Sequence, residues 1–172
     1  LLFRPEDMAR ATALFRRLGF AIPSDVASLA DMSSACNEFP LTHPATGSFF
    51  DVHWALTHPD KETPIDNEKL WRRSHLYGIA GVECRSLCLE DHLLYLCFHA
   101  VEHHRCVYVG PRALLDVAQM VAKPPKPIDW EDLIARAHEL GWSRGAWLML
   151  VLIQDHLGVS VPAGSIEALR PH

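Results

Sequence analysis

The sequence predicts an α+β protein, with a mixed sheet and helices in residues 1–64 and a mainly α-helical half in residues 65–172. Residues 50–56 place apolar side chains at every second position, which is the period of a half-buried strand. From Glu90 onward, apolar residues recur instead at helical spacing in four successive segments. The polar stretch 57–64 separates the two patterns, so we take it as a boundary between two domains.

The first 22 residues are predicted to form a strand, a helix and a second strand. Residues 1–3 are apolar and are predicted as the end of a buried strand, and residues 20–22 as a short strand after the helix. Pro5 suits the first turn of the helix, because its missing N–H would have no partner there anyway. Gly19 suits the helix end, since glycine readily adopts the left-handed conformation found there. Between them, apolar residues follow helical spacing: Met8, Ala11, Leu14, Phe15 and Leu18.

Residues 37–41 and 48–56 are predicted to pair as a β-hairpin, because the turn residues Pro44 and Gly47 lie between them. Alternation divides the second strand into two faces. One face carries Phe50, Val52, Trp54 and Leu56, and the other carries Phe49, Asp51, His53 and Ala55. The sequence gives no assignment for residues 25–36.

The second half is predicted to be mainly helical. A short helix over residues 65–75 and a short strand over residues 82–87 come first. The longer helices are expected in four places: from Glu90 through His103, and over residues 112–122, 129–140 and 143–156. Asp129 and Ser143 are suitable N-caps for the last two. The tail from Val161 is predicted as a loop and a frayed turn.

Composition argues against several classes of partner. The formal net charge is −5 and the isoelectric point is about 6.1, whereas nucleic-acid-binding domains usually lie above roughly 9. No apolar run reaches the ~18 residues that a membrane span needs. The five cysteines show no zinc-finger spacing, and free thiols suit a reducing compartment, so we expect a cytoplasmic protein. Because the chain begins with Leu1 rather than Met, we also expect further sequence ahead of it.

Asp51 is the first candidate for chemistry. A carboxylate between Phe50 and Val52, in an aromatic-rich strand, is costly to bury without a partner. His53 shares its face, and a strand that projects Asp and His from one face can present both to a metal ion. Spacing alone also permits a second interpretation, in which this face is the solvent side of a half-exposed sheet.

A second candidate group lies on the first long helix of the second half. His92, His99 and His103 share one helical face, and Asp116 on the next helix could reach the last two. His99 and His103 are spaced as two metal ligands one turn apart. The glutamate that follows the first histidine in zinc proteases is replaced by Ala100. The alternative is a polar contact between helices, in which the histidines pair with Asp116, a neighbouring glutamate or water.

Taken together, these segments resemble a known family. Four stretches in this order resemble the uncharacterised nucleotidyltransferases of bacteria, which are distant relatives of the minimal nucleotidyltransferases and of the polymerase-beta-like fold. They are LLFRPED at 1–7 running into a helix that ends LGF at 18–20, FDVHW at 50–54, residues 93–103 with their HAVEH, and LLDVA at 114–118 followed by IDW at 128–130. The resemblance spans most of the chain, and the ordered set is more specific than any single motif.

The resemblance implies a nucleotide-binding, magnesium-dependent transferase. In this family an Asp-x-Asp pair lies just ahead of the Leu-Leu before the first helix, and a later strand supplies a third carboxylate, which Asp51 matches. Together these carboxylates hold Mg²⁺, which binds a nucleoside triphosphate (NTP) and lets an acceptor hydroxyl attack the α-phosphorus. Asp51 is also a candidate for deprotonating that hydroxyl. The chain does not contain the Asp-x-Asp pair, so the resemblance implies that the first two metal-binding carboxylates precede Leu1.

Two other functions remain open beside nucleotidyl transfer to an unknown acceptor. One is a non-catalytic binding or interaction module on the same fold, which the presence or absence of the upstream Asp-x-Asp pair would distinguish. The other is a helical metal hydrolase that uses His99, His103 and Asp116. In the transferase these three residues would instead stabilise the helical half or contact substrate.

Overall fold

The structure is a computed structural model in which two compact units can be described. It describes residues 1–22, 36–58, 65–106 and 110–171. Residues 25–35, which the sequence left unassigned, and residues 59–64 of the predicted boundary lie outside these ranges. The units are Leu1–Asn67 and Glu68–His172, and each is considered by itself below. Strands come early in the chain and helices mostly later, which confirms the predicted α+β class.

The N-terminal unit contains one helix and one hairpin. Its elements are a 3₁₀ turn over Pro5–Asp7, α1 over Met8–Arg17, β1 over Glu38–Thr42 and β2 over Phe49–His53. The predicted helix is confirmed, and Pro5 opens it as expected, although the first turn is 3₁₀ rather than α. Gly19 follows the helix with a φ of 87°, the left-handed conformation that glycine adopts without steric cost.

The hairpin of β1 and β2 is antiparallel, with Phe39 opposite Val52. The predicted outer strands are present only as single bridges. Leu2 bridges His53 in a parallel sense, and Ala21 bridges Thr42 in an antiparallel sense. Thus β2 lies between β1 on one side and residues 1–3 on the other.

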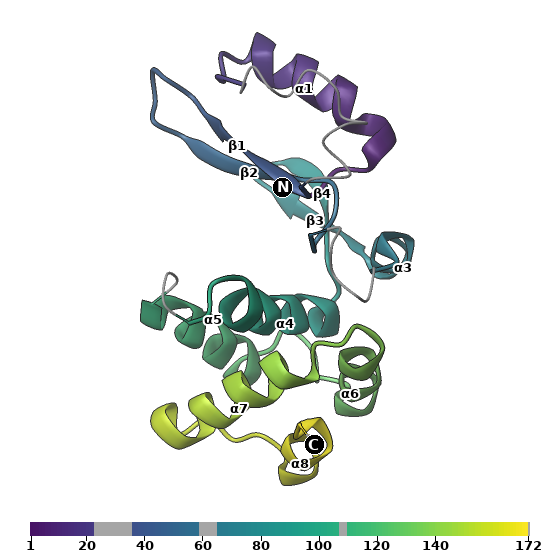
Figure 1. Ribbon diagram of the computed structural model, residues 1–172, viewed down its shortest axis with the longest axis vertical. Coiled ribbons are helices and arrows are strands. Elements are labelled where there is room, and N and C mark those ends of the chain that lie inside the picture. Colours follow the sequence, from purple (N-terminus) through teal and green to yellow (C-terminus); the bar gives the residue numbers. More distant parts are fainter. Residues whose placement is uncertain (23–35, 59–64, 107–109, 172) are drawn as a thin grey trace. The chain divides into compact units, whose positions relative to one another are not determined.

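Helix α1 covers one face of this hairpin (Figure 1), and the core lies between them. Alternation puts the apolar side chains of both strands on that face. The core residues are Met8, Ala11, Phe15, Phe39, Leu41, Val52 and Trp54. Phe50 was predicted to share the buried face, but it remains 38% exposed, and its ring packs only at the edge of the cluster, 5.5 Å from that of Phe20. The opposite face of the hairpin carries Glu38, Asp51 and His53, together with the exposed ring of Phe49.

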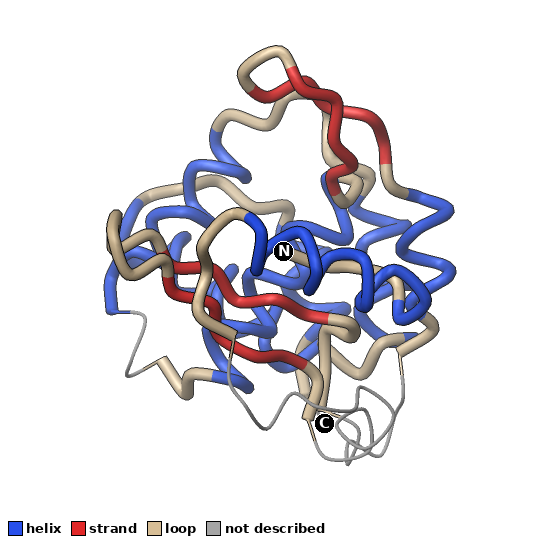
Figure 2. The backbone as a smooth tube through the Cα atoms, turned by 90° about the horizontal axis from the view of Figure 1, so that it is seen from above, coloured by secondary structure: helices blue, strands red, loops and turns tan. Residues whose placement is uncertain are grey.

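The C-terminal unit contains a second hairpin and a group of packed helices. Its elements in chain order are α3 (Asn67–Arg73, whose first residue belongs to the other unit), β3 (His75–Ile79), β4 (Val82–Ser86), α4 (Leu89–Phe98), a π-helical turn η2 (His99–His103), α5 (Gly110–Ala122), α6 (Trp130–Glu139), α7 (Ser143–Leu157) and α8 (Ala163–Leu169). Both hairpins of the chain are the red segments in Figure 2.

The second hairpin corrects the prediction for residues 65–75. The helix ends at Arg73, and β3 pairs antiparallel with β4, the short strand expected over 82–87. Its two-residue turn is Ala80 and Gly81, both with positive φ (51° and 80°), as a tight hairpin requires. Every residue of β3 is exposed, so no buried face imposes the alternation by which a strand is recognised in sequence.

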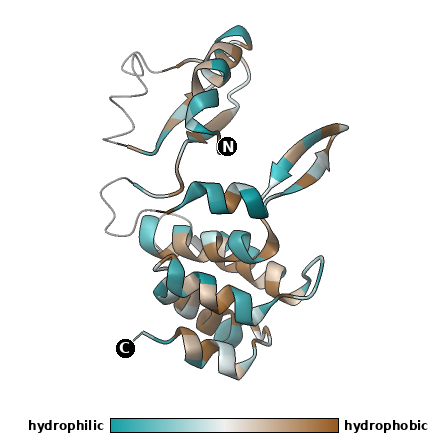
Figure 3. Cartoon of the chain, turned by 90° about the vertical axis from the view of Figure 1, so that its right-hand side faces the viewer, coloured by the Kyte–Doolittle hydropathy of each residue, from teal (hydrophilic) through white to brown (hydrophobic). Residues whose placement is uncertain are grey.

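Buried apolar residues join α4 to α5, α6 and α7, and Figure 3 shows that these helices also carry polar residues. Asp129 is confirmed as the N-cap of α6, because its side chain accepts a hydrogen bond from the Asp132 N–H. The prediction for Ser143 was wrong: Trp142 occupies the N-cap position of α7, and the Ser143 hydroxyl instead bonds to Nδ1 of His138. In the described ranges, no helix has the length and apolarity to cross a bilayer.

The predicted frayed tail is also wrong. Residues 163–169 form α8, whose Leu169 is fully buried. The helix packs on α6 and α7, and His138 Nε2 lies 3.1 Å from the carbonyl oxygen of Ala168. Such a short segment has little helical tendency by itself, so packing decides its conformation, and packing is not visible in local sequence.

Candidate functional site

Asp51 lies in β2, opposite Pro40 of β1. Its neighbour Val52 is fully buried against α1, and alternation therefore turns Asp51 to the other face. The residue is exposed. The cost of burying an unpaired carboxylate, which singled out Asp51 in the sequence, is thus avoided by exposure. A carboxylate in this position is accessible to a cation.

His53 shares that face and is held by a residue that sequence reasoning missed. Nδ1 of His53 lies 2.8 Å from Oε2 of Glu38, which stands directly opposite it in the register. Both side chains are partly buried. The predicted hairpin places Glu38 on this face, but its bounds pair Glu38 with Asp51, and the observed register is shifted by two residues so that Glu38 stands opposite His53. The polar face of the hairpin therefore carries two carboxylates and one imidazole, with Asp51 diagonal to Glu38.

The backbone beside Asp51 is fixed by a third segment. The Phe3 N–H donates to the carbonyl oxygen of His53 at 2.9 Å, and the His53 N–H donates to that of Leu1 at 2.7 Å. These are the two bonds of a parallel pairing. Residues 1–3 therefore run in the same direction as β2 and pair with it. They lie beside the strand that carries Asp51.

The structure brings together three histidines at the end of α4. One ligand atom from each of His99, His103 and His104 lies within 4.8 Å of the other two. The rings of His99 and His103 are nearly parallel, with centroids 5.1 Å apart, and the ring of His104 stands edge-on to both at 4.4 and 4.7 Å. His104 thus joins the pair that the sequence identified.

Asp116 and His92 lie outside this histidine cluster. Asp116 is an exposed residue of α5, with a carboxylate oxygen 3.8 Å from Nε of Arg112 one turn earlier. The sequence placed His92 on the same face as His99 and His103, but His92 lies seven residues, about 10 Å along the helix, before His99. The chain leaves α-helical geometry at His99, so His104 joins the other two instead.

A separate charge network holds the helices of this unit. Asp91 is fully buried and accepts two hydrogen bonds from Arg73, at 2.8 and 3.0 Å, and one from Arg136 at 3.0 Å. Hydrogen bonding to Asp91 raises the pKa of Arg73. Arg73 therefore belongs to a partly buried ion pair rather than to a solvated helix face. The network joins α3, α4 and α6 and explains these charges without a ligand.

The buried cysteine of α4 is not a candidate nucleophile. Burial raises the pKa of the Cys97 thiol to about 12, so it is protonated at neutral pH and lacks the reactive thiolate form. Burial also raises the pKa of Cys88, whose sulfur lies 2.9 Å from a guanidinium nitrogen of Arg136. Cys97 therefore belongs to the packed interior, and Cys88 is half-buried beside Arg136.

An α+β chain that presents a carboxylate from the polar face of a hairpin agrees with the nucleotidyltransferase class that the sequence resembles. A model of the family described as "Uncharacterised nucleotidyltransferase" matches residues 1–158, and the chain belongs to that family. No curated protein and no solved structure matches the chain. The general function is therefore nucleotidyl transfer, and the chemistry of the family implies a nucleotide substrate and a divalent metal.

The side chains on the polar face of the hairpin fit such a metal in kind. Carboxylate oxygens are the ligands that hard divalent cations prefer, and Asp51 offers them from an exposed position. Glu38 is the second carboxylate of that face, but His53 holds one of its oxygens. Among the described residues, only the histidine cluster groups three potential metal ligands. Asp51 can thus contribute one ligand to a metal site and needs others to complete it.

Proposed function

We propose that this protein transfers a nucleotidyl group from an NTP to an acceptor hydroxyl in a Mg²⁺-dependent reaction, with Asp51 as one metal ligand. The observation that carries the proposal is the exposure of Asp51 on the polar face of β2, beside the strand made by residues 1–3. Family membership supplies the reaction class.

The parallel register suggests where the other two carboxylates come from. Leu2 pairs with His53, and paired residues advance together along parallel strands. The position two residues before Leu2 therefore falls beside Asp51, with its side chain on the same face. An Asp-x-Asp pair at the positions one and three residues ahead of Leu1 would then project both carboxylates to that face. We propose that the intact protein completes its metal site in this way.

The residues of this chain have defined roles in the proposed reaction. The acceptor oxygen bonds to the α-phosphorus, the bond from that phosphorus to the α,β-bridging oxygen breaks, and pyrophosphate leaves. The proton of the acceptor hydroxyl passes to the carboxylate of Asp51. The contact between Glu38 and His53 fixes the strand pair on which Asp51 stands. A bound divalent metal would supply the positive charge that stabilises the transferring phosphoryl group.

Replacing Asp51 by Asn in the intact protein tests this function. We expect Mg²⁺-dependent pyrophosphate release to fall by at least about 100-fold, the scale on which loss of one charge-stabilising group acts. Asp155→Asn is the matched control, since Asp155 is an exposed aspartate of α7, and it should retain full activity. Equal activity of both variants would remove Asp51 from the mechanism. NTP binding without turnover in the unaltered protein would instead support the non-catalytic module.

A further inference from the structure

The histidine cluster at the end of α4 has a geometry that the proposed transfer reaction does not use. We propose that His99, His103 and His104 form a binding site for a divalent transition metal, with zinc as the expected ion. The three histidines belong to the C-terminal unit, whereas Asp51 belongs to the N-terminal unit. The site also differs in chemistry, since it offers three imidazoles rather than carboxylates.

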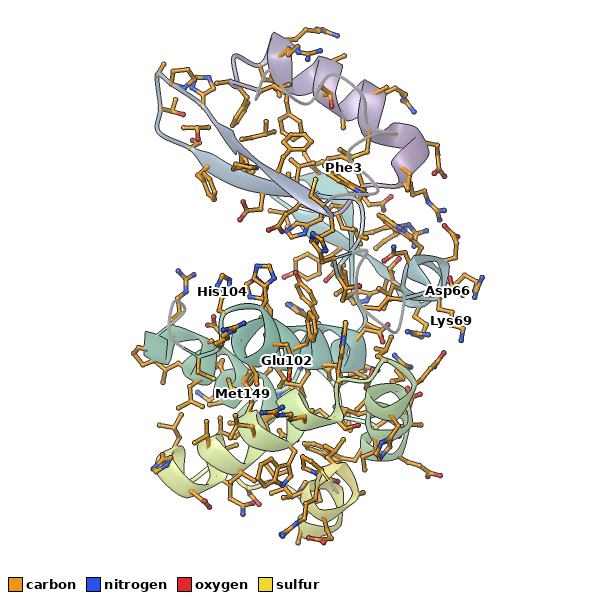
Figure 4. The ribbon with its side chains drawn as sticks, viewed as in Figure 1. Phe3, Asp66, Lys69, Glu102, His104 and Met149 are labelled. Atoms are coloured by element: carbon orange, nitrogen blue, oxygen red, sulfur yellow. The ribbon has the colours of Figure 1, made fainter. Side chains whose placement is uncertain are left out.

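The π-helical turn is what brings the third histidine to the other two. In an α-helix the residue at i+5 points about 140° away from residue i. Here the His104 N–H donates to the carbonyl oxygen of His99 at 3.0 Å, which is the i→i+5 bond of a π-turn. The wider turn places positions i, i+4 and i+5, which are His99, His103 and His104, on one side of the helix. Figure 4 shows His104 on one side of this part of the ribbon and Glu102 on the other.

The three ligand atoms are close enough together to bind a single ion. In a tetrahedral zinc site with Zn–N bonds of ~2.0–2.1 Å, two ligand nitrogens stand roughly 3.3 Å apart. The three ligand atoms of the cluster already lie within 4.8 Å of one another. Rotation of the imidazoles, without movement of the backbone, covers the difference of about 1.5 Å. Three histidines occupy three positions and leave the fourth for water or a ligand.

The backbone after the cluster supplies a second, independent observation. Arg105 and Cys106 both adopt positive φ (49° and 56°), which is unfavourable for residues with a Cβ atom. The Cys106 N–H donates to the carbonyl oxygen of Ala100 at 2.8 Å and closes the turn. Strained backbone of this kind, like the π-turn itself, concentrates at functional sites. The unfavourable conformation directly follows the three histidines in the chain.

The end of α4, which leads into the cluster, packs closely against α7. Gly145 of α7 lies so close to α4 that a Cβ atom there would come within 3.3 Å of the Cys97 carbonyl oxygen and 3.4 Å of the Phe98 Cα. The ring of Phe98 stacks on that of Trp142 with centroids 4.7 Å apart. His103 is exposed and His104 is half-buried, so an ion can reach the cluster from solvent. The imidazoles are therefore presented from a rigid helix.

Zinc binding by the purified, metal-free chain tests this inference. Calorimetric titration with Zn²⁺ should give about one equivalent, and His103→Ala and His104→Ala should each weaken binding by at least about 100-fold, because each removes a direct ligand. His92→Ala is the matched control, since it removes a histidine of the same helix outside the cluster. It should bind zinc like the unaltered chain.

Two further measurements separate the metal site from indirect effects. Far-ultraviolet circular dichroism should show that both cluster variants keep their helices, because His103 is exposed and His104 is half-buried. Co²⁺ should replace Zn²⁺ and give the visible absorption of a nitrogen-ligated ion, which the variants should lack. Unchanged zinc affinity in both cluster variants, or an equal loss in His92→Ala, would overturn the proposal.

Discussion

At the scale of single residues, the most consequential charge in the C-terminal unit is Asp91. Its side chain has no exposed surface, yet it contacts two guanidinium groups, those of Arg73 and Arg136. A buried charge without partners is far less stable than a paired one. The arginines therefore serve to make the burial of Asp91 tolerable, and removal of either leaves part of that charge uncompensated.

Arg73→Met should destabilise the chain by about 3 kcal/mol, because it removes both hydrogen bonds of the paired guanidinium while Asp91 stays buried. Arg72→Met is a suitable control, since Arg72 is the adjacent and exposed arginine, and it should change stability by less than about 0.5 kcal/mol. Urea unfolding followed by circular dichroism measures both. Equal stability of the two variants would show that the contact between Arg73 and Asp91 contributes little.

Single residues also show the limits of sequence reasoning about the sites. Asp51 could be found because it is a carboxylate within an aromatic-rich strand, and the structure places it on the polar face. The predicted strands place Glu38 on the same face as Asp51 and His53, but its pairing with His53 depends on a register that differs by two residues from the predicted one. His104 could not be found, because its approach to His99 depends on a π-turn. A π-turn differs from an α-turn by one residue, and packing around the helix decides between them.

At the scale of elements, sequence and structure agree where a buried face imposes a period. Helices α1, α5, α6 and α7 each carry apolar residues at helical spacing and lie close to their predicted ranges. Two elements without such a signal were missed. Strand β3 is wholly exposed, and α8 is a seven-residue helix. Their conformations depend on a turn at Ala80 and Gly81 and on the burial of Leu169.

The contact between α7 and α4 gives an element-scale prediction. Gly145→Val should destabilise the chain by about 2 kcal/mol, because the new side chain meets backbone atoms of α4 that cannot rotate away. Gly164→Val in α8 is the matched control, since nothing lies within 4 Å of a Cβ atom there. Valine has a slightly higher helix propensity than glycine, so this variant should stay within about 0.5 kcal/mol of the original. Thermal unfolding measures both, and similar losses would argue against close helix packing at Gly145.

At the scale of the whole molecule, the two units differ in the metal chemistry they offer. The N-terminal unit presents carboxylates from a hairpin, which suit magnesium. The C-terminal unit presents three imidazoles from a helix end, which suit zinc. A titration that distinguishes the two ions therefore also distinguishes the two units, and each proposal can fail without the other.

The separate cores of Leu1–Asn67 and Glu68–His172 lead to the last prediction. We propose that the chain consists of two domains, divided near residues 64 and 65, whose stabilities are largely independent. Leu41 and Leu150 are almost completely buried, one in each unit. Substitution of either by Ala should cost about 2–5 kcal/mol within its own core. Leu41→Ala should thus raise amide hydrogen exchange in the N-terminal unit alone, and Leu150→Ala in the C-terminal unit alone. If either substitution accelerates exchange equally in both units, the chain unfolds as one cooperative body, and the division into two domains is wrong.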